Sequence, residues 1–124
     1  MGMDIGVEIR GNVIVVAVQG RIDHLNAAAF HDALNPHLAE CRAGGAGIVL
    51  DLAGLEYISS AGLRIFMIAA KQARARGGRI AVAQMQPLVQ EIFEISHFHL
   101  VYEIFATTHD AVTALSSPAA VAAA

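Results

Sequence analysis

The sequence predicts an α/β domain with a mixed sheet of about five strands and about four helices. Short apolar runs rich in β-forming residues alternate with longer segments of helical periodicity, and a Gly-Asn pair separates the first two runs. Strands that alternate with helices pair in parallel through right-handed crossovers, whereas a tight Gly-Asn turn joins an antiparallel hairpin. We therefore expect an antiparallel N-terminal hairpin at the edge of a largely parallel sheet.

The composition indicates one domain that acts on other proteins. The chain has 124 residues, 56% of them hydrophobic, and its net charge of -3 includes no clustered basic patch for nucleic acid. The N-terminus lacks a signal-peptide pattern, and charges interrupt every apolar run before the ~18 residues of a membrane span. Cys41 is the lone cysteine and has apolar neighbours, as expected of a small core residue in a reducing compartment. We expect a cytoplasmic protein.

The first half of the chain predicts the hairpin and a helix. Residues 5–10 and 13–19 are the expected strands, and Asp23 stands where its carboxylate can cap the helix that follows. Helical spacing then continues over 25–41, although Pro36 should kink or divide this helix. The apolar face of the helix comprises Leu25, Ala29, Phe30, Ala33, Leu34, Leu38 and Cys41.

The second half predicts the remaining strands and helices. The compact apolar run 48–52 suits a central strand buried on both faces, and a Gly-containing loop leads from it into a helix over about 60–76. We assign residues 1–116 to the domain and expect 117–124 to form a frayed tail. The other expected elements are strands over 79–83 and 100–105 and helices that begin near Pro87 and Thr107.

Two adjacent serines, Ser59 and Ser60, lie where the loop becomes the second helix. A hydroxyl at a helix start lies near unsatisfied N–H groups, so it can cap the helix or carry a phosphate there. An esterase-type nucleophile elbow requires glycine two residues before and two after the serine. Gly62 meets the second requirement for Ser60, but Ile58 occupies the first position, so we do not expect an enzyme.

The histidines and glycines form no recognisable metal or nucleotide motif. No two of the six histidines have the four-residue helical spacing of a shared metal ion, and the lone cysteine cannot assist them. His97 and His99 could chelate a metal only in an extended segment, and surface or structural roles are the simpler interpretation. The glycine pairs at 44–45 and 77–78 lack the lysine and hydroxyl of a phosphate-binding loop. We expect no metal and no cofactor.

A helical wheel of the second helix separates a core stripe from a mainly polar side. Ile65 and Ile68 project with Ala61, and by position also Ala69, from the polar side and form a small apolar patch directly after the serines. This patch is either a contact with a neighbouring helix and scattered surface apolarity, or a docking face for another protein with Arg64 at its edge. The expected core stripe comprises Leu63, Phe66, Met67, Ala70 and Ala73.

A phosphate on Ser60 would add about -1.5 to -2 charges at neutral pH. The helix dipole and Arg64, one turn further on, should tolerate this charge in the free protein. Burial of the same dianion against an apolar or acidic partner would cost several kcal/mol. Phosphorylation could therefore abolish binding and leave the fold intact.

These residues resemble the STAS domains of bacterial anti-sigma factor antagonists. The resemblance covers nearly the whole chain, and its most specific part is the serine motif. It rests on the segments Gly20-Arg21-Ile22-Asp23, Ile48-Val49-Leu50-Asp51-Leu52 and Tyr57-Ile58-Ser59-Ser60-Ala61-Gly62-Leu63.

The resemblance implies a phosphorylation-controlled switch between protein partners. Antagonists of this kind bind an anti-sigma factor that is also a serine kinase and thereby free a sigma factor for transcription. Phosphorylation of the motif serine blocks binding, and a serine phosphatase restores it. An alternative within the same family is a non-catalytic STAS scaffold or an accessory subunit of a signalling complex or lipid transporter.

The family motif Asp-Ser-Ser/Thr-Gly-Leu assigns roles to individual positions. Ser60 takes the place of the phosphoacceptor, Ser59 replaces the acidic residue and Ala61 replaces the second hydroxyl. Ser59 therefore remains an alternative acceptor, and Asp23 matches the acidic residue of the family's early Gly-x-Leu/Ile-Asp segment. The expected partner-binding residues are Asp23, Ser59, Ser60, Ala61, Arg64, Ile65 and Ile68.

Overall fold

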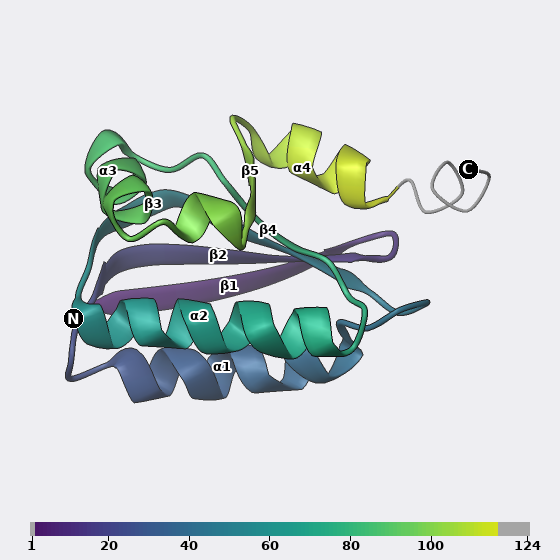
Figure 1. Cartoon of the computed structure of the whole chain (residues 1–124), viewed down its shortest axis with the longest axis horizontal. Coiled ribbons are helices and arrows are strands. Elements are labelled where there is room, and N and C mark those ends of the chain that lie inside the picture. The colour runs from purple at the N-terminus through teal and green to yellow at the C-terminus, as the bar shows by residue number, and fades with distance from the viewer. Residues whose placement is uncertain (1, 117–124) are drawn as a thin grey trace.

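A five-stranded mixed sheet in the order β1-β2-β3-β4-β5 organises residues 2–116, the part of the chain that the computed structural model describes. β1 pairs antiparallel with β2, and the other neighbours pair in parallel, which confirms the predicted fold class (Figure 1). The predicted tail, 117–124, lies outside the described residues.

The sequence order of the elements alternates strands and helices after the opening hairpin. None of the helices within residues 2–116 has the length and apolarity needed to cross a membrane. The strands are β1 (Met3–Arg10), β2 (Val13–Ile22), β3 (Gly47–Ile58), β4 (Ile80–Ala83) and β5 (Glu103–Phe105). The helices are α1 (Ala27–Glu40), α2 (Ser60–Ala75), α3 (Pro87–Ile95), the 3-10 helix η1 (Phe98–Leu100) and α4 (Thr108–Leu115).

Strand alternation divides the core into two layers. Ile48 and Leu50 of β3 belong to the larger cluster, which includes side chains of α1, α2 and α3, whereas Val49 between them belongs to the smaller cluster under α4. Figure 1 shows α1 and α2 side by side along the sheet. The first part of β3, from Gly47 to Leu50, is thus buried on both faces, as predicted for a central strand.

The first helix differs from its prediction at both ends and at Pro36. α1 runs without interruption from Ala27 to Glu40 with Pro36 inside it. Proline removes one helical hydrogen bond, but Leu34 and Leu38 are buried on either side of it and hold the helix against the core. Leu25 lies before the helix and is 81% exposed, so its assignment to the apolar face was wrong.

Several strand boundaries also differ from the sequence prediction. β3 continues to Ile58, where we expected a loop, because β2 continues beside it to Ile22 with two register shifts. Leu55 and Ile58 are buried in this extension. The last strand begins at Glu103, since the residues up to Leu100 form the 3-10 helix η1.

An aromatic cluster centred on Phe66 fills the space between α2 and its neighbours. The Phe66 ring lies 5.2 Å from Phe30, 5.4 Å from Phe93 and 6.0 Å from Tyr102, measured between ring centroids. The Tyr102 hydroxyl donates a hydrogen bond of 2.6 Å to the Phe66 carbonyl oxygen. Burial raises the pKa of the Tyr102 phenol well above its usual value, so it remains a protonated donor.

Candidate functional site

The carboxyl ends of β2 and β3 bring Asp23 and the two serines to one edge of the sheet. Ile22 and Ile58 are register partners, and the Ser59 N–H donates a 2.8 Å hydrogen bond to the Ile22 carbonyl oxygen. Segments that are more than thirty residues apart in the sequence are therefore neighbours in the fold. Both α1 and α2 begin at this edge (Figure 1).

Asp23 organises a turn and does not cap the helix, because α1 has Asn26 at its N-cap. The Asp23 carboxylate accepts hydrogen bonds from the N–H groups of Leu25 at 2.9 Å and Asn26 at 3.1 Å. The Asn26 side chain accepts one in return from the Asp23 N–H, at 2.9 Å. This turn displays the Leu25 side chain to solvent beside Asp23, so Leu25 is an apolar candidate residue that the sequence analysis did not include in the site.

Ser59 and Ser60 have different environments. Ser59 is the N-cap of α2, with extended backbone (φ -81°, ψ 173°), and its hydroxyl accepts a 3.2 Å hydrogen bond from the Gly62 N–H. Ser60 is the first residue of the helix and is exposed, and its hydroxyl has no hydrogen-bond partner in the described part of the chain. The Ser59 hydroxyl is thus engaged in a hydrogen bond, whereas the Ser60 hydroxyl is accessible to a modifying enzyme.

Ser59→Ala is expected to lower the free energy of unfolding by about 1 kcal/mol, because the start of α2 loses its side-chain cap. Chemical denaturation followed by circular dichroism measures this change. Ser60→Ala is the matched control and should change stability by less than about 0.5 kcal/mol, as is usual for exposed positions. Equal losses in the two variants would contradict the separate roles.

Gly62 seats the start of α2 on the ends of β2 and β3. A Cβ atom at this position would lie 2.6 Å from Ile22 Cγ2 and 2.9 Å from Ile58 Cγ2, both on buried, branched side chains. Such contacts are too short for any residue except glycine unless the helix moves. The glycine of the motif therefore fixes where Ser60 is presented.

The buried face of α2 is rotated from the predicted stripe. Its buried residues are Gly62, Phe66, Ala69, Ala70 and Ala73, whereas Leu63 and Met67 are only half-buried. Ile65 is half-buried as well and packs against the larger core cluster. The placement of Ile65 and Ala69 on the projecting side was therefore wrong, since Ile65 packs against the core and Ala69 is buried.

We define the α2 ridge as Ser60, Arg64, Ile68 and Lys71, whose spacing of four, four and three residues places them in one line along the helix. Ser60, Arg64 and Lys71 are exposed and Ile68 is half-buried. Ala61, also half-buried, flanks the line next to Ser60. The ridge thus combines a hydroxyl, two cations and one branched apolar side chain.

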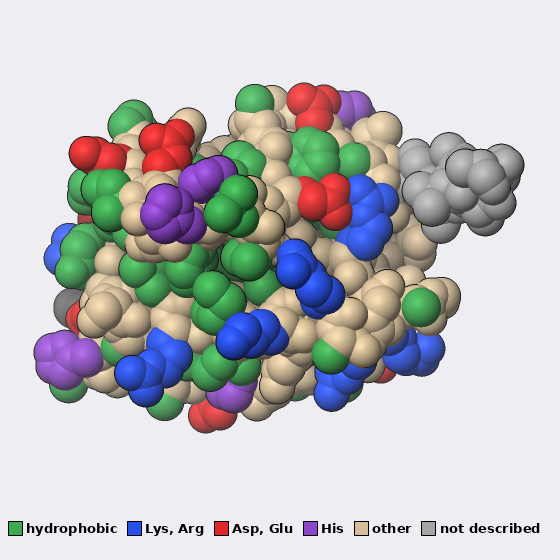
Figure 2. Space-filling view, in the orientation of Figure 1, with side chains coloured by type: hydrophobic (Ala, Val, Ile, Leu, Met, Phe, Trp, Pro, Cys, Tyr) green, Lys and Arg blue, Asp and Glu red, His purple; other side chains and the backbone are tan. Residues whose placement is uncertain are grey.

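The charge of α2 is entirely positive. The helix contains Arg64, Lys71 and Arg74 and no acidic residue, and Figure 2 shows basic side chains along the part of the surface that α2 occupies. Arg64 forms no ion pair with any residue of 2–116. Arg21 is a further cation at the same sheet edge, and its guanidinium lies 4.6 Å from the centroid of the Tyr57 ring. A partner that covers α2 should be acidic or apolar.

The other candidate sites do not join this edge. His97 adopts a left-handed conformation (φ 60°) before η1, and its ring centroid lies 6.0 Å from that of His99. The segment is not extended, and residues 2–116 contain no cluster of three or more metal-ligating side chains.

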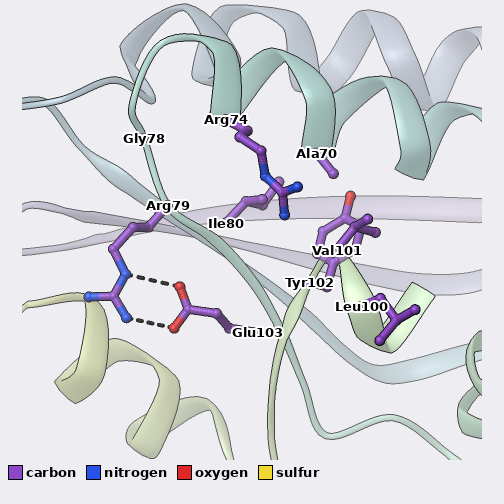
Figure 3. Close-up of a pocket in the computed structure, with 9 residues that line it drawn as sticks. All are labelled: Ala70, Arg74, Gly78, Arg79, Ile80, Leu100, Val101, Tyr102 and Glu103. Atoms are coloured by element: carbon purple, nitrogen blue, oxygen red, sulfur yellow. Dashed lines mark hydrogen bonds and ion pairs between the residues drawn. The ribbon is translucent and has the colours of Figure 1, made fainter. Parts of the chain in front are cut away.

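A separate hollow of about 230 Å³ lies between the second half of α2 and the segment from η1 to β5 (Figure 3). Its charged lining consists of Arg74 and of a two-bond ion pair, in which Arg79 donates to Glu103 at 2.9 and 2.6 Å. This pair is internally neutral, and no predicted site residue lines the hollow. The edge with Asp23 and Ser60 therefore remains the candidate site.

Comparison with known proteins agrees with the fold. The profile of the family described as "Mlab, STAS domain" matches residues 5–102. BtrV of Bordetella bronchiseptica, which carries the name of an anti-sigma factor antagonist, is 36% identical over 92 residues, or 74% of this chain and 77% of BtrV. RsfB of Mycobacterium tuberculosis, named as an anti-sigma-F factor antagonist, is 26% identical over 101 residues, or 82% of this chain and 80% of RsfB.

A solved structure of an anti-sigma factor antagonist from Mycobacterium paratuberculosis superposes with a TM-score of 0.82 at 25% sequence identity. The superposition covers 93% of this chain and 95% of that chain. Sequence and fold therefore agree on the same group of proteins.

Proposed function

The chain belongs to the STAS domain family, and on that premise we propose that it is a cytoplasmic anti-sigma factor antagonist switched by phosphorylation of Ser60. In this function it binds an anti-sigma factor that is also a serine kinase, and it performs no catalysis itself. The observation that carries the proposal is the exposed hydroxyl of Ser60, which has no hydrogen-bond partner within residues 2–116, beside the engaged hydroxyl of Ser59.

The hydrogen bonding at the helix start favours Ser60 over Ser59 as the phosphoacceptor. A kinase must reach the hydroxyl oxygen, and the Ser59 oxygen is half-buried and accepts the Gly62 N–H. Phosphorylation of Ser59 would also displace the cap of α2. Ser60 can take a phosphate without the loss of any hydrogen bond within residues 2–116.

Phosphorylation would change the charge of the α2 ridge and leave the fold in place. A phosphate adds about -1.5 to -2 charges next to the positive end of the helix dipole and one turn from Arg64. The free protein tolerates these charges, whereas an acidic or apolar partner surface would have to bury a dianion at a cost of several kcal/mol. The modified protein should therefore stay folded and release its partner.

We place the partner contact on the shared sheet edge and the α2 ridge. Leu25 joins the expected set because it is exposed beside Asp23, and Ile65 contributes from its half-buried position on the flank of the helix. The proposed contact set is Asp23, Leu25, Ser59, Ser60, Ala61, Arg64, Ile65 and Ile68.

Incubation with the cognate kinase and ATP should add one phosphate to the protein, on Ser60. Intact mass spectrometry followed by peptide mapping identifies the modified residue. Ser60→Ala should abolish the modification and Ser59→Ala should retain it, which makes the two variants a matched pair. An unmodified protein, under conditions where the kinase phosphorylates another substrate, would contradict the proposal.

The replacement of the motif's acidic residue by Ser59 favours a second candidate, a non-catalytic STAS scaffold or accessory subunit of a signalling complex or lipid transporter. Such a protein would bind its partners without a phosphate cycle. The same assay separates the two candidates, because only the antagonist should accept phosphate at Ser60 and lose it to a serine phosphatase.

A further inference from the structure

β1 is an edge strand that lacks two features that usually protect such an edge, a bulge and a proline, although one of its faces carries charged side chains. Its eight residues pair with β2 in an unbroken register, so the strand contains no bulge, and its sequence contains no proline. No other strand within residues 2–116 pairs with its outer side. Val7 and Ile9 are 48% and 63% exposed. A long, regular edge with exposed apolar side chains is suited to pairing with another strand.

The side chains of β1 separate into an apolar row and a charged row. Val7 and Ile9 are register partners of Val16 and Ile14, which belong to the larger core cluster, so they point to the same face as α1. α1 packs against β2 and β3 and leaves them uncovered. Ile5 continues the apolar row, and the opposite row comprises Asp4, Gly6, Glu8 and Arg10.

We propose that two copies of this chain associate through β1, antiparallel and about a two-fold axis at Val7, to form a continuous ten-stranded sheet (twice the five strands of one copy). In this register Val7 faces Val7 of the second copy, and Ile5 faces Ile9. Asp4 faces Arg10 of the second copy, so each dimer contains two new ion pairs, each between one Asp4 and one Arg10. Arg10 also retains its ion pair with Glu8 of the same copy, which lies on the same face of the strand, with the Arg10 Nε atom 3.2 Å from Glu8 Oε2.

The charges of β1 select this register over its neighbours. An axis at Gly6 would place Asp4 directly opposite Glu8, and an axis at Glu8 would place two copies of Glu8 opposite each other. Like charges in directly opposed positions destabilise a strand pair. An axis between two residues would set the apolar row of one copy beside the charged row of the other, which loses the apolar contact.

The helices leave room for this association. Strands are spaced about 4.8 Å apart, so the two copies of α1, each over β2 and β3, would lie roughly 15–20 Å apart. Helices are about 10 Å in diameter, so they would flank the paired apolar rows without a clash. In the antiparallel dimer, the sheet edges that carry Ser60 in the two copies point in opposite directions, and both remain accessible to a partner. The dimer does not depend on the proposed phosphorylation switch.

Disulfide cross-linking tests the register directly. In Val7→Cys the two introduced sulfurs face each other across the axis, at a Cβ separation of about 5 Å that a disulfide can span with slight adjustment. In Ile9→Cys they lie about 13 Å apart along the strands, although Ile9 is the more exposed residue. The native Cys41 is buried, and burial raises the pKa of its thiol, so the unmodified protein is an unreactive control.

Mild oxidation should therefore cross-link Val7→Cys at least about tenfold faster than Ile9→Cys, as measured by non-reducing electrophoresis over time. Both changes replace exposed side chains, and circular dichroism checks that the variants are folded. Equal rates, or faster cross-linking of Ile9→Cys, would overturn the proposed register.

A charge exchange tests the ion pairs in solution. Because a single eight-residue strand pair is a small interface, the unmodified protein should form a weak dimer whose fraction rises with concentration in sedimentation equilibrium. Arg10→Asp should weaken dimerisation on the order of tenfold, and the double variant Asp4→Arg/Arg10→Asp should recover most of that loss. A monomer at every concentration, or a dimer indifferent to both changes, would overturn the proposal.

Discussion

Phe66→Ala is expected to lower the free energy of unfolding by about 3–5 kcal/mol. Phe66 is fully buried and lies at the centre of the aromatic cluster, with its ring 5.2 to 6.0 Å from those of Phe30, Phe93 and Tyr102. The cavity left by the ring would remove contacts on three sides at once. Since natural domains are stable by only about 5–15 kcal/mol, this single change threatens the whole fold.

Urea unfolding followed by far-ultraviolet circular dichroism measures the effect of Phe66→Ala. The control is Leu88→Ala on α3, a large apolar side chain that is 51% exposed and should change stability by about 0.5 kcal/mol or less. If Phe66→Ala and Leu88→Ala unfolded at the same midpoint urea concentration, the aromatic cluster would not be what holds α2 to its neighbours.

Local sequence signals predicted most of the fold. The Gly-Asn turn, the apolar run of β3 and the glycines after α2 act over a few residues, so the hairpin, the central strand and the end of the helix were expected correctly. The boundaries that failed depend on contacts distant in the sequence. β3 extends to Ile58 because β2 continues to Ile22 beside it, which no periodicity within β3 could indicate.

The sequence correctly placed the two serines at the start of α2, but it misplaced part of the apolar face beside them. A helical wheel gives the period of α2 but not the directions from which other elements approach it. The wheel therefore counted Leu63 and Met67 as core and Ile65 as surface, although all three are half-buried. Leu25 was missed because its four-residue spacing from Ala29 is typical of one helix face, whereas the Asp23 turn holds it outside α1.

Ile65 and Ile68 are both half-buried, but only Ile65 packs against the larger core cluster, and this difference decides which of them can test the docking face. A charge at Ile65 would be driven against the core cluster and would destabilise the protein, so lost binding would have two explanations. A charge at Ile68 would lie on the α2 ridge between Arg64 and Lys71, both exposed, and could pair with either. Ile68 is therefore the position at which binding can be changed without a loss of fold.

Ile68→Asp is expected to weaken binding of the anti-sigma factor by about 30-fold or more, equivalent to roughly 2 kcal/mol. The change replaces the apolar centre of the α2 ridge with a carboxylate and neutralises part of its positive charge. An acidic or apolar partner would then have to bury a like or unpaired charge. Titration calorimetry with the purified partner measures the affinity, and thermal unfolding should show a midpoint near that of the unmodified protein.

The matched control is Ile95→Asp, which makes the same chemical change at a 71% exposed isoleucine at the C-terminal end of α3. Its affinity should stay within about threefold of the unmodified protein, because it lies outside the proposed contact set. Ser60→Asp should reproduce the loss seen with Ile68→Asp, since both place negative charge on one ridge. If Ile68→Asp bound normally while Ser60→Asp did not, the partner would contact the sheet edge at Asp23 and Leu25 and leave the middle of α2 uncovered.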